Sequence, residues 1–164
     1  MICLIGFMGC GKTTIGKILS EALNEKWIDL DDYIEKKAGK RISEIFKEEG
    51  EAYFRALEQE CLKQLLQEEK GIISTGGGVI ISPENVKMLQ KTCTIYLAYP
   101  FDILYSRIAG DANRPLATSY KELQERFYKR LDLYEQASQV KIDCKDKSIN
   151  QITQEILTYL EKIS

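Results

Sequence analysis

Residues 6–13 read Gly6-Phe7-Met8-Gly9-Cys10-Gly11-Lys12-Thr13, which matches G-x-x-x-x-G-K-[ST] at every fixed position. The motif follows a short apolar run over residues 1–6. It precedes residues 12–24, whose apolar side chains recur at the spacing of one helix face. A phosphate-binding loop requires this strand–loop–helix order. A tight glycine turn without a ligand is the structural alternative, but the full motif in its context favours a site for a nucleoside triphosphate.

The residue types in this loop suit the chemistry of a triphosphate. Gly9 and Gly11 permit backbone torsions that aim successive N–H groups at one phosphate. The dipole of the helix that begins near Lys12 adds attraction for the anion. We expect the Lys12 ammonium to reach the β- and γ-phosphates and the Thr13 hydroxyl to ligate Mg²⁺. The predicted nucleotide contacts of the loop are Gly9, Cys10, Gly11, Lys12, Thr13 and Thr14.

Outward from the loop, short apolar runs alternate with longer amphipathic segments. Strands are expected at residues 1–6, 26–29, 72–75, 92–98 and around 140–142. Helices are expected at residues 12–24, 31–38, 42–69 with a break at Gly50, 83–90, 101–109, 120–138 and 149–163. Strands that are joined through helices form a parallel sheet covered on both faces. The sequence therefore predicts an α/β fold, with a five-stranded parallel sheet flanked by helices in a three-layer sandwich.

The length and the absence of linkers predict one domain over residues 1–164. Two segments, residues 31–60 and 110–119, are too polar for us to expect them in the core. Polar segments of this kind often move over a site. We interpret the first as a helical substrate-binding segment and the second as a lid.

Composition excludes several classes of protein. The chain has no histidine, which excludes a Ser-His or Cys-His nucleophilic pair and a histidine-ligated metal. Its five scattered cysteines indicate reduced intracellular thiols, and its net charge of −2 gives no basic field for nucleic acid. No apolar run reaches the ~18 residues of a membrane span, and no basic region precedes the first apolar run. We therefore expect a cytoplasmic protein without nucleic-acid or membrane partners, acting as a monomer.

Three carboxylates follow the second expected strand, at Asp29, Asp31 and Asp32. Ligands of open α/β sheets collect outside the carboxyl ends of the strands, so these side chains should face the phosphate-binding loop. One could hold the water shell of Mg²⁺, and another could accept a proton from the phosphoryl acceptor. Helix capping is the alternative, with Glu35 placed as in a capping box. Beside the loop we favour function for Asp29 and Asp31 and capping for Asp32.

Two further features suggest an anionic acceptor. Arg55 lies three residues before Glu58, which is the spacing of a surface ion pair but also of a guanidinium oriented to grip a carboxylate. Spacing alone favours the surface pair. Gly76-Gly77-Gly78 follows the third expected strand, where three glycines cost conformational entropy and have no evident packing role. We expect backbone to pass close to a ligand there, with the N–H of Gly77 exposed to bond it.

The remaining candidates are arginines. Arg114, in the polar stretch before Pro115, could be delivered by a closing loop to neutralise a transferring phosphoryl group, and Arg107 lies upstream of it. A solvent-exposed arginine without a functional role is an equally good interpretation of this loop residue. Arg126 and Arg130 lie four residues apart on one helix. A solvated face is the better reading of Arg126, and spacing leaves Arg130 open.

Together these residues resemble the shikimate kinases, within the nucleoside-monophosphate-kinase-like group of P-loop kinases. The resemblance covers essentially the whole chain and rests on joint motifs: residues 6–14, Asp29-x-Asp31, Phe54-Arg55 to Glu58, Gly76-Gly77-Gly78, Arg114-Pro115-Leu116 and Arg130. It implies a kinase that transfers the γ-phosphoryl group of ATP to the 3-hydroxyl of shikimate, on the route to chorismate and the aromatic amino acids.

The resemblance also implies roles for single residues. It assigns shikimate to Asp31, Arg55, Gly77 and Arg130, with the two arginines on its carboxylate and Asp31 as the candidate base. We also expect Gly76 and Gly78, next to Gly77, to contact the acceptor. Arg114 is the implied lid arginine on the ATP phosphates, with Arg107 on the nucleotide, and Mg²⁺ lies at Thr13 with Asp29 nearby through water.

Two positions depart from the family pattern. Leu30 stands between the two aspartates where the family usually has a small residue, and Leu116-Ala117 stands where two leucines are more usual. Neither change removes a charged group. A related kinase acting on another hydroxy acid, such as gluconate, is the alternative enzyme. A nucleotide-dependent switch is the alternative without catalysis, but it would have no use for Asp31, Arg55 and Arg130 together.

Overall fold

The computed structural model describes residues 1–110 and 119–164. In this part of the chain the strands are β1 Ile2–Ile5, β2 Trp27–Asp29, β3 Ile72–Ser74, β4 Cys93–Ala98 and β5 Val140–Asp143. The helices are α1 Lys12–Leu23, α2 Leu30–Ala38, α3 Ile42–Glu49, α4 Glu51–Leu65, α5 Pro83–Gln90, α6 Phe101–Ala109, α7 Tyr120–Ala137 and α8 Ile149–Ile163. A short 3-10 helix, η1 Val79–Ile81, follows the three glycines and was not expected from the sequence.

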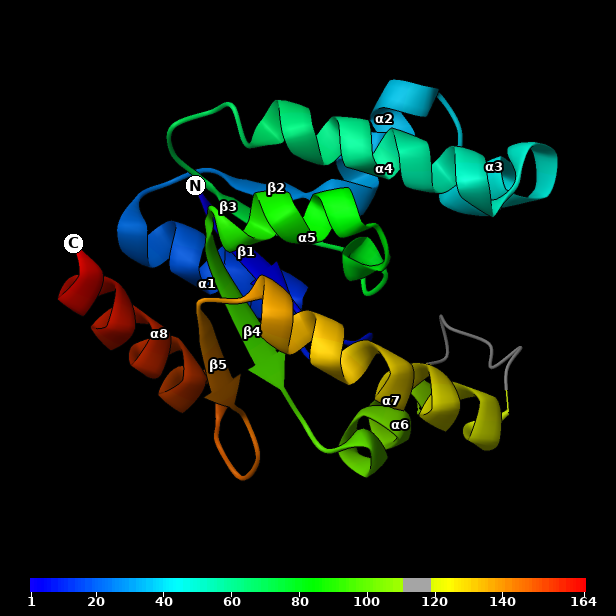
Figure 1. Ribbon diagram of the computed structural model, residues 1–164. Coiled ribbons are helices and arrows are strands. Elements are labelled where there is room, and N and C mark those ends of the chain that lie inside the picture. The colour runs from blue at the N-terminus through cyan, green and yellow to red at the C-terminus, as the bar shows by residue number, and fades with distance from the viewer. Residues whose placement is uncertain (111–118) are drawn as a thin grey trace.

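The strands form one parallel sheet in the order β2-β3-β1-β4-β5. Helices α1 and α8 pack together on one face of this sheet, and α5 and α7 pack together on the other (Figure 1). This arrangement confirms the predicted parallel α/β sandwich. Because β1 and β3 are neighbours, the loops that leave their carboxyl ends, residues 6–11 and 75–78, emerge side by side.

The core is the apolar filling between the sheet and its two helix layers. β1 and β3 are buried almost throughout, because helices cover both of their faces. Four of the cysteines are buried and Cys93 is partly buried, and none is in a disulfide, so they pack as small apolar side chains. In the described residues, no helix is long and apolar enough to cross a membrane.

Residues 31–60 contain three helices, and the break expected at Gly50 is present. Gly50 has φ 86° and lies between α3 and α4, and Gly39 ends α2 with φ 72°. The expectation that this segment is too polar for the core was wrong. Ile34, Ile45 and Phe54 are buried, because α2, α3 and α4 pack their apolar sides against one another. The polar residues that dominate its composition lie on the outer faces.

Candidate active site

The phosphate-binding loop has the backbone that its sequence predicts. Gly9 and Gly11 have φ 84° and 91°, a region that side-chain-bearing residues rarely adopt. Helix α1 begins at Lys12 without a side-chain cap, so its first N–H groups are left for a ligand. The loop borders a cavity of about 660 Å³. Its lining residues are Met8, Gly9, Gly11, Lys12, Thr13, Thr14, Asp29, Asp31, Ser74, Thr75, Gly76, Gly77, Arg107 and Ile108.

Cys10 differs from the other predicted loop contacts. Its side chain is only 2% exposed, and its backbone N–H donates to the carbonyl of Phe7 within the loop. Nothing in the sequence separates Cys10 from its neighbours, since the turn that uses this N–H forms only in the folded loop. The structure therefore does not bring Cys10 to the cavity wall, unlike Gly9, Gly11, Lys12, Thr13 and Thr14.

Lys12 lies folded over its own loop. Its Nζ donates to the carbonyl of Gly6 at 2.6 Å and to that of Phe7 at 3.3 Å. Its backbone carbonyl accepts a hydrogen bond from Ser74 Oγ at 2.7 Å, and Trp27 Nε1 donates to the same oxygen of Ser74 at 2.9 Å. These last contacts tie the backbone of the first turn of α1 to β3 and β2, while the ammonium itself is held by carbonyls of its own loop.

The carboxylates after β2 have divided roles. Asp29, and not Asp32, is the N-cap of α2: its Oδ1 accepts from the N–H of Asp31 at 2.8 Å and from that of Asp32 at 3.2 Å. The helix starts at Leu30, directly after β2, so the residue before it, Asp29, takes the capping position. Glu35 does not complete a capping box, because its carboxylate accepts from the N–H of Ile42 instead.

Asp31 points into the cavity and is perturbed electrostatically. Burial raises the pKa of its carboxyl to about 6; the nearby Asp29 charge also raises it, and Lys12 opposes the shift. Burial likewise raises the pKa of Asp29. A carboxylate whose pKa lies close to neutrality can accept a proton from a hydroxyl and release it again, which suits Asp31 to a site of proton transfer.

Arg55 lies on α4 and is more than a surface ion-pair residue, because its side chain is only 19% exposed. Its Nη1 donates to Glu58 Oε1 at 3.0 Å and to the carbonyl of Gly78 at 3.1 Å. Glu58 is buried, and burial raises the pKa of its carboxyl even though Arg55 opposes that shift. The buried Nε of Arg55 has no hydrogen-bond partner among the described residues, although Glu51 lies 3.6 Å away. Arg55 is thus oriented by α4 and by the glycine loop.

The three glycines have a packing role that the sequence did not suggest. A Cβ on Gly78 would lie 2.5 Å from Arg55 Nη2, and a Cβ on Gly76 would lie 3.0 Å from Asp31 Oδ1. A Cβ on Gly77 would lie 3.4 Å from the N of Met8 and 3.6 Å from Arg130 Nη1. None of the three has a positive φ, so close approach and not torsion disfavours a side chain at Gly76 and Gly78. Gly78 makes room for Arg55 and Gly76 for Asp31, while Gly77 borders Arg130 at an ordinary contact distance.

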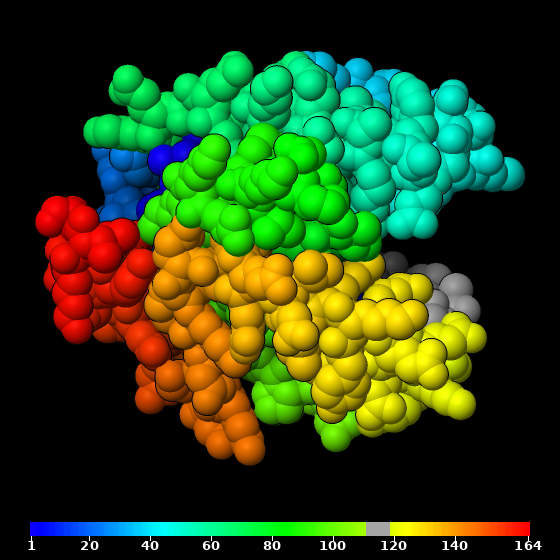
Figure 2. Space-filling model, viewed as in Figure 1, coloured from blue at the N-terminus to red at the C-terminus, as the bar shows by residue number. Residues whose placement is uncertain are grey.

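Arg130 is brought to this loop from α7. Its guanidinium lies 5.9 Å from the centre of the Phe7 ring, and burial lowers its pKa, with Arg55 contributing to the shift. Arg126, one turn earlier, is exposed, as its sequence context favoured. Two partly desolvated guanidinium groups near one another form a favourable site for a carboxylate. In the view of Figure 2 the surface is hollowed between α3–α4, in cyan, and the start of α7, in yellow.

Arg107 lies on α6 at the other side of the phosphate-binding loop. Its Nη1 donates to the carbonyl of Gly9 at 3.0 Å, and its guanidinium lies 4.3 Å from the centre of the Tyr99 ring. The flat guanidinium is exposed beside the loop, where a nucleotide could stack on it. Arg114 and nearly all of the predicted lid, residues 110–119, lie outside the described residues.

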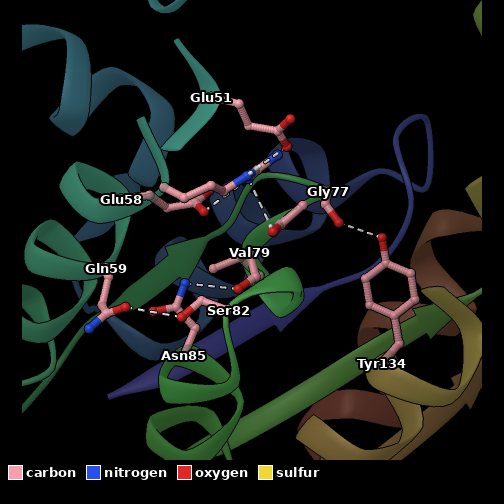
Figure 3. Close-up of polar contacts among 10 residues, drawn as sticks. Glu51, Glu58, Gln59, Gly77, Val79, Ser82, Asn85 and Tyr134 are labelled. Carbon is pink, nitrogen blue, oxygen red and sulfur yellow. Dashed lines mark hydrogen bonds and ion pairs between the residues drawn. The ribbon is translucent and has the colours of Figure 1, made fainter. Parts of the chain in front are cut away.

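Sequence reasoning missed two residues that fix the glycine loop. Tyr134 donates from its hydroxyl to the carbonyl of Gly77, and Asn85 Nδ2 donates to the carbonyl of Val79 at 2.9 Å (Figure 3). Both side chains are fully buried. Tyr134 follows Arg130 by one helical turn, and that spacing was the signal that could have found it.

Comparisons with known proteins identify the family of this chain. A family model described as "SKI: Shikimate kinase" matches residues 8–161. A shikimate kinase of Persephonella marina is 42% identical over 158 residues, which cover 95% of this chain and 96% of that protein. The solved shikimate kinase of Acinetobacter baumannii in complex with shikimate has a TM-score of 0.90 at 33% identity, covering 99% of this chain and 93% of that one.

A gluconokinase of Sinorhizobium meliloti shares the fold alone. Its TM-score is 0.65 at 14% identity, with 99% of this chain and 91% of that one covered. The family match over most of the chain, the identity of the curated relative and the cavity built from the predicted motifs lead to one conclusion: this chain belongs to the shikimate kinase family of ATP-dependent phosphotransferases.

Proposed function

We propose that this chain transfers the γ-phosphoryl group of ATP to the 3-hydroxyl of shikimate, giving shikimate 3-phosphate and ADP. One observation carries the proposal: a single cavity is lined by the phosphate-binding loop on one side and by Asp31, Gly76 and Gly77 on the other. Arg130 lies next to Gly77, and Arg55 lies next to Gly78 of the same loop. Donor and acceptor can therefore occupy one cavity, as an in-line transfer requires.

On the nucleotide side, the amides of the loop and the Lys12 ammonium hold the triphosphate. Lys12 exchanges its bonds to the carbonyls of Gly6 and Phe7 for phosphate oxygens, which accept more strongly because they are charged. Arg107 contacts the nucleotide beside the loop, and we retain Arg114 as the lid arginine that neutralises the transferring group.

The residues present fit a magnesium ion. Thr13 and Asp29 line the same cavity, and hard oxygen ligands of this kind suit Mg²⁺. Both capping bonds of Asp29 use Oδ1, which leaves Oδ2 available to a water of the metal's shell. When bound, the ion neutralises charge on the phosphates. Thr13 supplies its hydroxyl as a ligand, and Asp29 orients the shell while it still caps α2.

On the acceptor side, Arg55 and Arg130 take the carboxylate of shikimate, and the glycine loop offers its backbone to the ring hydroxyls. Asp31 accepts a hydrogen bond from the hydroxyl that is phosphorylated, and its raised pKa suits it to take the proton. Because phosphoryl transfer passes through a loose transition state, orientation of the hydroxyl by Asp31 is as important as removal of its proton.

The remaining parts of the proposal concern the whole chain. Residues 1–164 act as one domain, with residues 31–60 as the acceptor-binding segment and 110–119 as the lid. We propose a monomer, because a single chain supplies every group assigned above. We place it in the cytoplasm, where ATP is available and where its five free cysteines stay reduced.

A coupled assay of ADP release tests the proposal. With ATP and Mg²⁺ present, shikimate should raise the rate far above the rate without an acceptor, and gluconate should leave it at that background. A rate that depends on gluconate would select the alternative kinase. Tight ATP binding with no turnover on either acceptor would indicate a nucleotide-dependent switch and overturn the proposal.

A further inference from the structure

The carbonyl groups of the glycine loop are held by side chains from three separate helices. Tyr134 of α7 donates to the carbonyl of Gly77, Arg55 of α4 to that of Gly78, and Asn85 of α5 to that of Val79 (Figure 3). The carbonyl of Gly76 accepts from the backbone N–H of Val79. Four successive peptide carbonyls are therefore fixed in a segment whose residues have little intrinsic rigidity.

Fixing these carbonyls also fixes the N–H groups of the loop. A peptide unit is planar, so the N–H of each residue points opposite to the carbonyl of the residue before it. The Gly77 carbonyl thus sets the direction of the Gly78 N–H, and the Gly76 carbonyl that of the Gly77 N–H. Gly76 and Gly77 line the cavity, so the Val79 N–H sets the direction of the Gly77 N–H there, and Tyr134 sets the Gly77 carbonyl together with the next N–H, that of Gly78.

Tyr134 is the donor that shares a helix with a predicted site residue, Arg130. Tyr134 is 0% exposed, and its ring stacks on Tyr96 with centroids 5.2 Å apart and planes at 26°. Burial raises the pKa of its hydroxyl, which therefore stays protonated and able to donate. Arg130 lies one helical turn earlier, and its Nη1 lies 3.6 Å from the position that a Cβ on Gly77 would take.

We propose that Tyr134 is a positioning residue for the acceptor: its hydroxyl fixes the Gly77–Gly78 peptide beside the Arg130 guanidinium, so that an anionic hydroxy acid meets the glycine loop and Arg130 together. The inference rests on the function proposed above. It adds a residue that touches neither substrate and acts through the glycine loop, which does. Since glycine has wide torsional freedom, the hydroxyl adds a restraint to the one that the Val79 N–H supplies at the Gly76 carbonyl.

The test is Tyr134→Phe, with Tyr96→Phe as the matched control. Both substitutions remove one hydroxyl from a buried ring of the same stacked pair and keep the ring itself. Steady-state kinetics of the full chain should show a roughly tenfold rise in the shikimate KM for Tyr134→Phe, as expected for one lost hydrogen bond at an organised site. The ATP KM and the slow ATP hydrolysis without shikimate should stay within twofold, and Tyr96→Phe should change none of these values.

Two results would overturn the inference. An unchanged shikimate KM in Tyr134→Phe excludes a positioning role. An equal rise in both KM values, or the same change in Tyr96→Phe, shows general loosening of the core. Failure of shikimate to stimulate the unsubstituted chain would instead contradict the proposed function, so the two failures are distinguishable.

Two further measurements keep the inference testable. Combining Tyr134→Phe with Arg130→Ala should give less than the product of the two separate effects, because Arg130 lies against the glycine that Tyr134 holds and the two changes affect the same end of the acceptor. If the phenylalanine variant melts below the assay temperature, NMR of the unsubstituted chain labelled at tyrosine Cζ replaces it. Saturating shikimate should then shift the Tyr134 signal and leave that of Tyr96 in place, and an unmoved Tyr134 signal would refute the role.

Discussion

The two halves of the site are built in different ways. The nucleotide half, residues 6–14, is one continuous stretch whose shape follows from three glycines with positive φ and from the start of α1. The acceptor half, which consists of Asp31, Arg55, Gly76–Gly78 and Arg130, comes from α2, α4, the loop after β3 and α7. Local backbone conformation forms the first, and packing between distant elements forms the second.

This difference predicts how each half fails. A substitution in the nucleotide half should remove a group from the phosphates directly, with large effects on turnover. A substitution in the acceptor half should displace neighbouring groups. The loss of acceptor affinity should then increase with the size of that displacement. The variants below separate these two behaviours, beginning with the largest expected effect.

Lys12→Ala tests the nucleotide half at its charged group. We expect turnover to fall roughly 10³-fold, because an ammonium that stabilises developing phosphate charge is lost from a site shielded from water. The coupled ADP assay measures this, and circular dichroism checks that the fold persists. Lys17→Ala, on an exposed side of the same helix, should keep nearly full activity. Similar losses in both variants would remove Lys12 from its assigned role.

Asp31→Asn tests the carboxylate that lies between the two halves. We expect kcat to fall about 10²-fold with the ATP affinity nearly intact. In the unsubstituted chain the rate should fall as the pH drops below about 6, because the Asp31 carboxyl then gains a proton. The residual rate of the variant should not depend on pH in this range. Asp32→Asn, one residue on and exposed, is the control. Collapse of ATP affinity in Asp31→Asn would contradict the assignment.

The same variant should be more stable than the unsubstituted chain at neutral pH. The pKa of Asp31 rises from 3.8 to about 6 on folding, so between these values the folded state binds more protons than the unfolded one. Stability is thus lost as pH rises through this window, and asparagine avoids the loss. We expect a gain on the order of 2 kcal/mol at pH 8 that vanishes near pH 3, measured by thermal or urea unfolding. If the variant is less stable than the unsubstituted chain at pH 8, burial of the charged Asp31 carboxylate does not destabilise the fold.

Arg130→Ala tests the acceptor half at its charged group. Loss of a charge-assisted pair to the acceptor carboxylate should raise the shikimate KM roughly 30-fold and leave the ATP KM within about twofold. Arg126→Ala, one helical turn away and exposed, should change neither value. Equal changes in the two KM values would mean that Arg130 supports both halves and that the division drawn above is wrong.

Alanine at each of the three glycines tests the packing of the acceptor half. The added methyl would lie 2.5 Å from Arg55 at position 78, 3.0 Å from Asp31 at position 76 and 3.4 Å from backbone at position 77. The loss of shikimate affinity should follow that order, from roughly tenfold at Gly78 downward. Since the ends of side chains can move aside, the Gly78 variant should still fold. Isothermal titration with shikimate measures the series, and a reversed order would refute this account.

Ser74→Ala should give the smallest effect, because it alters only the support behind Lys12. The change removes the hydrogen bond to the Lys12 carbonyl and leaves Trp27 Nε1 without its acceptor. About 1 kcal/mol of stability should be lost, or a few degrees in Tm, with a rise of about twofold in the ATP KM. Thr153→Ala, which removes a buried hydroxyl from α8, should lower Tm similarly but leave the ATP KM unchanged.

Most of the fold was predictable from the sequence. The five strands and the main helices follow from apolar runs, helix-face periodicity and breaks such as Gly50, all of which are local signals. The cap of α2 was misplaced from Asp29 to Asp32, because the helix begins directly after β2, at Leu30, and the exact start of a helix decides which side chain faces the free N–H groups. The burial of Ile34, Ile45 and Phe54 was missed because average polarity hides a narrow apolar stripe.

The candidate site, too, was predictable from the sequence only in part. Spacing could not tell whether Arg55 was a surface ion-pair residue, and it left Arg130 open. The partial burial of both side chains, and the places kept for them by Gly78 and Gly77, are visible only in the folded chain. Tyr134 and Asn85 carry no motif at all, since each acts by donating to a backbone carbonyl that the fold brings to it.

By itself, the sequence determined the class of fold and the phosphate-binding loop, because glycine torsions and helix starts depend on residues that are neighbours in the chain. Only the tertiary structure decided the acceptor half. Its guanidinium groups, carboxylate and glycine loop are separated by tens of residues, and their distances, burial and charge states exist only once the sheet and the surrounding helices have packed.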